Sequence, residues 1–101
     1  MVLTSGGGDI ELTSTVDTKD GSAARNLTIA NTSGSATITG AIGTGTNGAL
    51  GNLTIGSAGA GAITLTGAIG GSGSAGAAII AIGNADTATL TMGGADYNTS
   101  G

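Results

Sequence analysis

The segment AITLTGAI, Ala62–Ile69, is the basis for predicting the fold, because near copies of it lie on both sides. The copies are SATITGAI at Ser35–Ile42, the more polar DIELTSTV at Asp9–Val16, and TATLTMGG at Thr87–Gly94, in which the alternation ends early at two glycines. In each copy apolar and polar residues alternate, a period of two that indicates a β-strand rather than a helix. The sequence therefore predicts a β structure built from repeats.

Aliphatic residues recur along the chain at a nearly constant spacing. Aligned on their central aliphatic residue, the copies lie 26, 27 and 25 residues apart. The predicted core columns are Leu12, Ile38, Leu65 and Leu90; Val16, Ile42 and Ile69; Leu27, Leu53 and Ile80; and Ile29, Ile55 and Ile82. Their agreement on one period predicts a single repeat domain over residues 1–101, with repeats at about 9–34, 35–61, 62–86 and, in part, 87–101.

Two folds are consistent with this repeat. One is a parallel β-solenoid of about four coils, in which equivalent residues stack at roughly 4.8 Å. The other is an antiparallel β-sandwich of hairpins. We favour the solenoid because like residues then stack on like, whereas a sandwich needs no repeat period. Gly40, matched by Gly67, interrupts the apolar face at a point where a strand can bend.

The composition excludes several classes of partner. With only Lys19 and Arg25 as basic residues and Tyr97 as the sole aromatic residue, the chain can neither neutralise a run of phosphates nor stack bases, so nucleic acid is not expected as a partner. No apolar stretch reaches the length of a membrane-spanning helix, so membrane insertion is not expected either. Cysteine is absent, which leaves no disulfide or thiolate metal site.

Asp9 and Glu11 are the candidate catalytic pair, since they lie two residues apart on one strand face and paired carboxylates can hydrolyse glycosides. We interpret them instead as solvated charges, and no enzymatic activity is predicted. Calcium is a further candidate, because GGGD at Gly6–Asp9 and GGAD at Gly93–Asp96 are similar to the glycine-aspartate repeats of calcium-binding β-rolls. The acids do not recur in register, so no cofactor is assigned.

Threonine residues form two neighbouring outward columns in the predicted alignment. One column holds Thr13, Thr39, Thr66 and Thr91, and the other holds Thr37, Thr64 and Thr89 behind Glu11. In a solenoid they would form a flat T-x-T array, with columns roughly 6.5–7 Å apart along the strand. Such an array is similar to the ice-binding face of β-solenoid antifreeze proteins. Threonine is also a favoured exposed residue of β-sheets, where its ladders stabilise cross-strand pairs.

Four N-x-S/T sequons occur, at Asn26, Asn31, Asn52 and Asn98, and each is a formal acceptor for N-glycosylation. In a chain this rich in threonine and asparagine, sequons also arise by chance. Asn26 and Asn52 occupy equivalent repeat positions, which alternatively indicates a stacked asparagine at a corner.

The segments ITLTGAIG and GNLTIGSAGAGAITLTGAIG, which end at Gly70, resemble the glycine- and threonine-rich repeats of filamentous-haemagglutinin-like and autotransporter-passenger proteins of bacterial surfaces. The resemblance implies an extracellular, right-handed parallel β-helix that acts as a stalk or adhesive shaft. We therefore predict a secreted, non-enzymatic structural segment of an adhesin or self-assembling surface filament. Its partners would be copies of itself or flanking repeats, joined by end-to-end strand stacking. The alternative is a module that binds ice or surface carbohydrate through the threonine columns.

Overall fold

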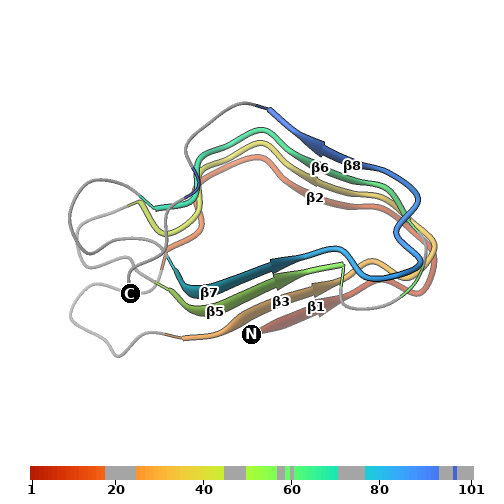
Figure 1. Cartoon of the computed structure of the whole chain (residues 1–101), viewed down its shortest axis with the longest axis horizontal. Coiled ribbons are helices and arrows are strands. Elements are labelled where there is room, and N and C mark those ends of the chain that lie inside the picture. The colour runs from red at the N-terminus through yellow and green to blue at the C-terminus, as the bar shows by residue number, and fades with distance from the viewer. Residues whose placement is uncertain are drawn as a thin grey trace.

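The structure is a computed structural model, and its described residues form strands and no helix (Figure 1). It describes residues 1–17, 25–44, 50–56, 59, 61–70, 77–93 and 97. The strands are β1 (Val2–Thr4), β2 (Ile10–Leu12), β3 (Leu27–Ala30), β4 (Ala36–Ile38), β5 (Leu50–Ile55), β6 (Ile63–Leu65), β7 (Ala77–Ile82) and β8 (Leu90–Met92). The predicted all-β class is confirmed.

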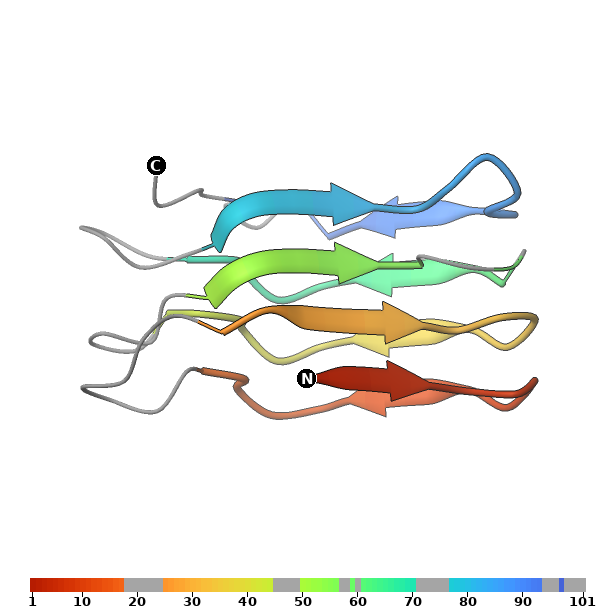
Figure 2. The same ribbon diagram turned by 90° about the horizontal axis from the view of Figure 1, so that it is seen from below.

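The strands form two four-stranded sheets, and successive strands alternate between them. Sheet 1 has the order β1-β3-β5-β7, and sheet 2 has the order β2-β4-β6-β8. Figure 2 shows the strands of each sheet stacked side by side, with β1 at one end and β7 at the other. We call each pair of consecutive strands a tier: β1 with β2 is the first tier, and β7 with β8 is the fourth.

All strand pairs among the described residues are parallel. The antiparallel sandwich, which the sequence left open as the alternative fold, is therefore wrong for these strands. Parallel strands cannot be joined by a tight hairpin, because the chain must return to the same end of the sheet before it can pair again. Here each return is made through a strand of the opposite sheet.

The register places like residues on like in both sheets. In sheet 1, Leu27 pairs with Leu53 and Leu53 with Ile80, while Ile29 pairs with Ile55 and Ile55 with Ile82. In sheet 2, Leu12 pairs with Ile38 and Ile38 with Leu65. Isolated parallel bridges join Val16 to Ile42, Ile42 to Ile69, and Ile69 to Tyr97.

The fourth tier departs from the predicted alignment by two residues. Leu65 pairs with Met92, and Leu90 pairs with Ile63, so the predicted pairing of Leu65 with Leu90 is wrong. The step between the last two copies is thus 27 residues rather than 25. A shift of two residues keeps every inward side chain on the inward face, so alternation alone could not distinguish the two registers.

The first tier begins before the first predicted repeat boundary at residue 9. Val2–Thr4 forms β1, which pairs with β3 and sets Leu3 beside Ile29. Leu3 thereby extends the core column that was predicted to begin at Ile29. The segment VLT has one inward aliphatic residue, which is too short a pattern to identify a strand by periodicity.

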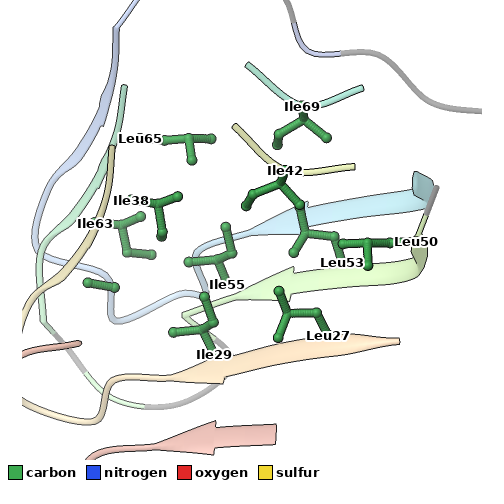
Figure 3. Close-up of a cluster of buried hydrophobic side chains, with 11 residues drawn as sticks. Leu27, Ile29, Ile38, Ile42, Leu50, Leu53, Ile55, Ile63, Leu65 and Ile69 are labelled. Atoms are coloured by element: carbon green, nitrogen blue, oxygen red, sulfur yellow. The ribbon is translucent and has the colours of Figure 1, made fainter. Parts of the chain in front are cut away.

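Aliphatic side chains from both sheets fill the space between them, as Figure 3 shows. The core consists of Leu27, Ile29, Ala36, Ile38, Ile42, Leu50, Leu53, Ile55, Ile63, Leu65 and Ile69. Burying a leucine or isoleucine fully contributes roughly 1.5–3 kcal/mol to the free energy of folding. Because the chain has a single aromatic residue, this aliphatic cluster supplies most of its hydrophobic stabilisation. The core lies mostly in the second and third tiers.

Glycine at the bends lets neighbouring tiers approach closely. A Cβ on Gly40 would lie 2.0 Å from the carbonyl oxygen of Ser14, and one on Gly61 would lie 1.8 Å from that of Gly34. Real Cβ atoms are not found so near backbone oxygens, so any side chain here would force the tiers apart. The bend predicted at Gly40 is thus a point of backbone contact between tiers.

Candidate functional site

Threonines line the outer face of sheet 2. The first column runs from Glu11 through Thr37 and Thr64 to Thr91, in consecutive parallel register. Thr37 and Thr64 are half-buried and Thr91 is exposed. The alternating burial of β4 and β6, with the threonine between two buried residues, directs the hydroxyls away from the core.

The second column begins where each strand of sheet 2 ends. The amide of Thr39 donates to the Leu12 carbonyl at 2.9 Å, and that of Thr66 donates to the Ile38 carbonyl at 2.8 Å. In the fourth tier, Gly93 makes the equivalent bond to Leu65 at 2.8 Å. Glycine therefore ends a column that was predicted to contain Thr91. Thr39 and Thr66 are both exposed.

Thr89 lies outside the column predicted for it. Its carbonyl accepts a hydrogen bond from the Ile63 amide at 2.8 Å, just as the Ala62 carbonyl accepts one from Ala36 at 2.9 Å. Thr89 is thus equivalent to Ala62, while Thr91 takes the place predicted for Thr89. We define the threonine face as the residues that the structure does bring together: Thr37, Thr39, Thr64, Thr66 and Thr91.

The threonine face carries hydroxyl and methyl groups at regular spacing. Neighbouring strands lie roughly 4.8 Å apart, and successive outward residues on one strand lie roughly 6.5–7 Å apart. Each threonine hydroxyl can both donate and accept hydrogen bonds, and an apolar methyl group stands beside it. Such a face can order water or contact a repetitive polar surface.

The Asp9 carboxylate connects the first two tiers. Its Oδ1 accepts hydrogen bonds from the Ser35 amide at 2.8 Å and from the Ser35 hydroxyl at 2.9 Å. The Ser35 backbone bond, followed by the hydroxyl bond, holds the pKa of the Asp9 carboxyl below its ordinary value of 3.8. Glu11 is exposed and stands in register with Thr37. Within the described ranges, no group of three or more His, Cys, Asp or Glu residues could hold a metal ion.

Three of the sequon asparagines, Asn26, Asn52 and Asn31, form hydrogen bonds in the structure. The Asn26 Oδ1 accepts a hydrogen bond from the backbone amide of Asn52 at 2.8 Å, so these equivalent residues are linked as a stacked pair. Asn31 is only 1% exposed, and its Nδ2 donates to the Gly34 carbonyl at 2.9 Å. Burial leaves no room for a glycan on Asn31. Asn98 lies outside the described residues.

The fourth tier leaves apolar side chains uncovered. Leu90 and Met92 are each 43% exposed, although they pair with Ile63 and Leu65, which are 1% and 0% exposed. A hollow of about 460 Å³ lies beside them and is lined by Ile82, Gly83, Asn84, Thr87, Ala88, Thr89 and Leu90. No sequence motif predicts this hollow, because it lies at the end of the stack that the described residues form.

Comparisons with protein-family models, with curated proteins and with solved structures found no match to this chain. None of the described segments forms a helix long and apolar enough to cross a membrane.

Proposed function

We propose that the chain is a segment of a right-handed parallel β-solenoid of about four coils, each tier being one coil. It serves as a non-enzymatic structural element of an extracellular adhesin or self-assembling surface filament. The observation that carries this proposal is the continuous register of like residues through both sheets. Because each repeat contacts only its neighbours, further repeats can be added along the same axis, and a long shaft can be built in this way.

The edges of the sheets support the mechanical part of the proposal. β1 and β2 end the stack on one side, and β7 and β8 end it on the other. Among the described residues, each end strand pairs with a neighbour on one side only, and an edge strand is a template for further pairing. Further coils at these edges, from copies of the chain or from flanking repeats, would lengthen the shaft by the same contacts that join its tiers.

The threonine face favours a second candidate, a module that binds ice or surface carbohydrate. Thr39 and Thr66 are exposed in one column, and Thr64 with Thr91 continues the other. Regular hydroxyls can match the spacing of ordered water or of a repeating polysaccharide. In a shaft, the same threonines only solubilise and stabilise the outer surface.

Bulky substitutions on the two outer surfaces separate these functions. The test variant is Thr39→Tyr with Thr66→Tyr, and the matched control is Thr28→Tyr with Thr54→Tyr, a paired set on the outside of sheet 1. A shaft should keep its β-sheet circular dichroism and its appearance in electron micrographs in both variants. A binder should lose thermal hysteresis or polysaccharide retention in the first variant only.

The wild-type chain provides the test of the solenoid itself. Its circular dichroism should be dominated by β-sheet, and electron micrographs should show rods or filaments of uniform width. A spectrum dominated by helix would contradict the proposal. Thermal hysteresis by the wild type would move the assignment to the second candidate.

A further inference from the structure

The fourth tier ends with the same inward columns that its neighbours bury. Leu90 continues the column of Ile10, Ala36 and Ile63, and Met92 continues that of Leu12, Ile38 and Leu65. In sheet 1, Ile82 continues the column of Leu3, Ile29 and Ile55. The hollow beside Ile82 and Leu90 therefore lies where one more tier would place its own aliphatic side chains.

Backbone groups at this end are also set in a repeating pattern. The amides of Ile10, Ala36 and Ile63 donate to the following tier at 2.8, 2.9 and 2.8 Å, and Leu90 is the next residue in that series. In sheet 1 the carbonyls of Ile29 and Ile55 accept from the following tier at 2.8 and 2.7 Å. Ile82 is the next acceptor. The β7–β8 edge thus offers a donor and an acceptor at fixed positions.

The opposite end of the stack carries the matching surface. Leu3, Ile10 and Leu12 of the first tier are half-buried, and they begin the columns that finish at Ile82, Leu90 and Met92. A second copy laid on the fourth tier in the same orientation would pair its β1 and β2 in parallel, as every pair of tiers already does. No strand would need to reverse.

Charge favours head-to-tail stacking of two copies over a symmetric contact between two first tiers. In head-to-tail stacking, Glu11 of the second copy would lie over Thr91, and Asp9 over Thr89, so carboxylates meet hydroxyls. If two first tiers met face to face, β2 would pair antiparallel with β2 of the other copy. In the register that pairs Ile10 with Leu12, two Glu11 carboxylates would lie opposite each other, and in the register that pairs Ile10 with Ile10, Glu11 would lie opposite Asp9. Like charges directly across a sheet are destabilising.

We propose that the β7–β8 end of one chain binds the β1–β2 end of a second copy, with Leu3, Ile10 and Leu12 of that copy stacking on Ile82, Leu90 and Met92. The inference rests on the proposed function and names the partner and the register of its end-to-end contact. Because the two surfaces differ, the contact is heterologous, and repetition without closure builds an open, polar filament.

Engineered cysteines test the register in a chain that has none of its own. Facing residues of parallel strands lie about 4.8 Å apart, within the range of about 4.4–6.8 Å that a disulfide requires. An equimolar mixture of Glu11→Cys and Thr91→Cys chains should form a mixed disulfide dimer under mild oxidation. A chain carrying both substitutions should form a ladder of higher species. The intrachain pair Thr37→Cys with Thr64→Cys is the geometric control, since these residues face each other.

The single-cysteine chains decide the orientation. Dimers of Thr91→Cys alone, or of Glu11→Cys alone, would show symmetric end-to-end contact and overturn the proposal. A wild-type chain that keeps its β-sheet signal yet stays monomeric at high concentration would also overturn it, while leaving the solenoid intact. Loss of the β-sheet signal in the wild type would instead contradict the proposed function.

Thr13→Pro gives an independent result if a cysteine variant fails to fold. The amides of Thr39 and Thr66 bond to the preceding tier. The described residues form no tier before the first, so in the proposed register the equivalent amide of Thr13 bonds to the second copy. Removing it should weaken self-association and leave the β-sheet signal unchanged. Thr39→Pro is the matched control, because it deletes a bond inside the chain and should lower stability. Unchanged assembly of Thr13→Pro would contradict the proposed register.

Discussion

The third and fourth tiers have similar inward residues but very different surroundings. Leu65 in the third tier is 0% exposed, whereas its partner Met92 in the fourth is 43% exposed. The strands pair in the same direction and register, so the difference comes from what covers each tier. A residue of this repeat is part of a core only when tiers lie on both sides of it. Stability therefore resides in the stacking of tiers rather than in any single tier.

The sharpest test of this difference compares Ile38→Ala with Leu90→Ala. Ile38 is fully buried, and removing such a side chain typically costs about 2–5 kcal/mol, including the cavity left behind. Leu90 is 43% exposed, so its loss should cost clearly less in the monomer. Urea denaturation followed by circular dichroism at low protein concentration measures both values. Equal losses would mean that Leu90 is covered in solution.

Gly40→Ala and Gly6→Ala compare an inner bend with the outer end. A Cβ on Gly40 would meet the Ser14 carbonyl, whereas one on Gly6 would meet nothing within 4 Å. Forcing a methyl group into a packed contact typically costs about 1–3 kcal/mol. We expect that loss for Gly40→Ala and little change for Gly6→Ala, measured as denaturation midpoints. A neutral Gly40→Ala would show that the bend can open without disturbing the tiers.

Asn31 and Asn84 extend the comparison to the polar corners. Asn31 is buried and its Nδ2 donates to the Gly34 carbonyl at 2.9 Å. The Nδ2 of half-buried Asn84 donates to the Gly56 carbonyl at 2.6 Å and to the Gly59 carbonyl at 3.0 Å. Asn31→Ala should cost about 1 kcal/mol, because an acceptor loses its partner where water cannot replace it. Among the described residues the Asn31 Oδ1 has no hydrogen-bond partner, so the substitution removes only the bonds of the Nδ2 group. Asn84→Ala should cost less, and the reverse order would contradict the role of burial.

The sequence was sufficient for the all-β class, because alternation and period are local properties of the chain. It was insufficient for the fourth tier, where TATLTM satisfies two registers that differ by two residues and place either Leu90 or Met92 beside Leu65. The two threonine columns were predicted to be continuous, yet Gly93 ends one of them. Only the hydrogen bonds between tiers resolve such a choice.

Other features of the site depend on distant contacts that no local pattern encodes. Asn31 has the same sequon as exposed Asn26, and only the tiers around it make it a buried corner residue. In the sequence, Tyr97 is an aromatic residue without a repeat equivalent. In the structure it extends the column of Ile69, and its hydroxyl donates to the Leu65 carbonyl at 3.2 Å. Aromatic and aliphatic residues can share a column because inward position, not residue type, decides membership.

The smallest expected effect concerns the exposed link between the first two tiers, where Asp9 accepts two hydrogen bonds from Ser35. Because these bonds lower the pKa of the Asp9 carboxyl in the folded chain, the ionised form is favoured by folding. Their contribution is present above the ordinary pKa of 3.8 and is lost as the pH falls through the lower folded value. Asp9→Asn should reduce the acid sensitivity of the denaturation midpoint in that range, and Ser35→Ala, which removes the hydroxyl donor and keeps the backbone amide, should reduce it less. If neither variant changed the acid sensitivity, the first two tiers would be held together by their ladder and core alone, without help from this carboxylate.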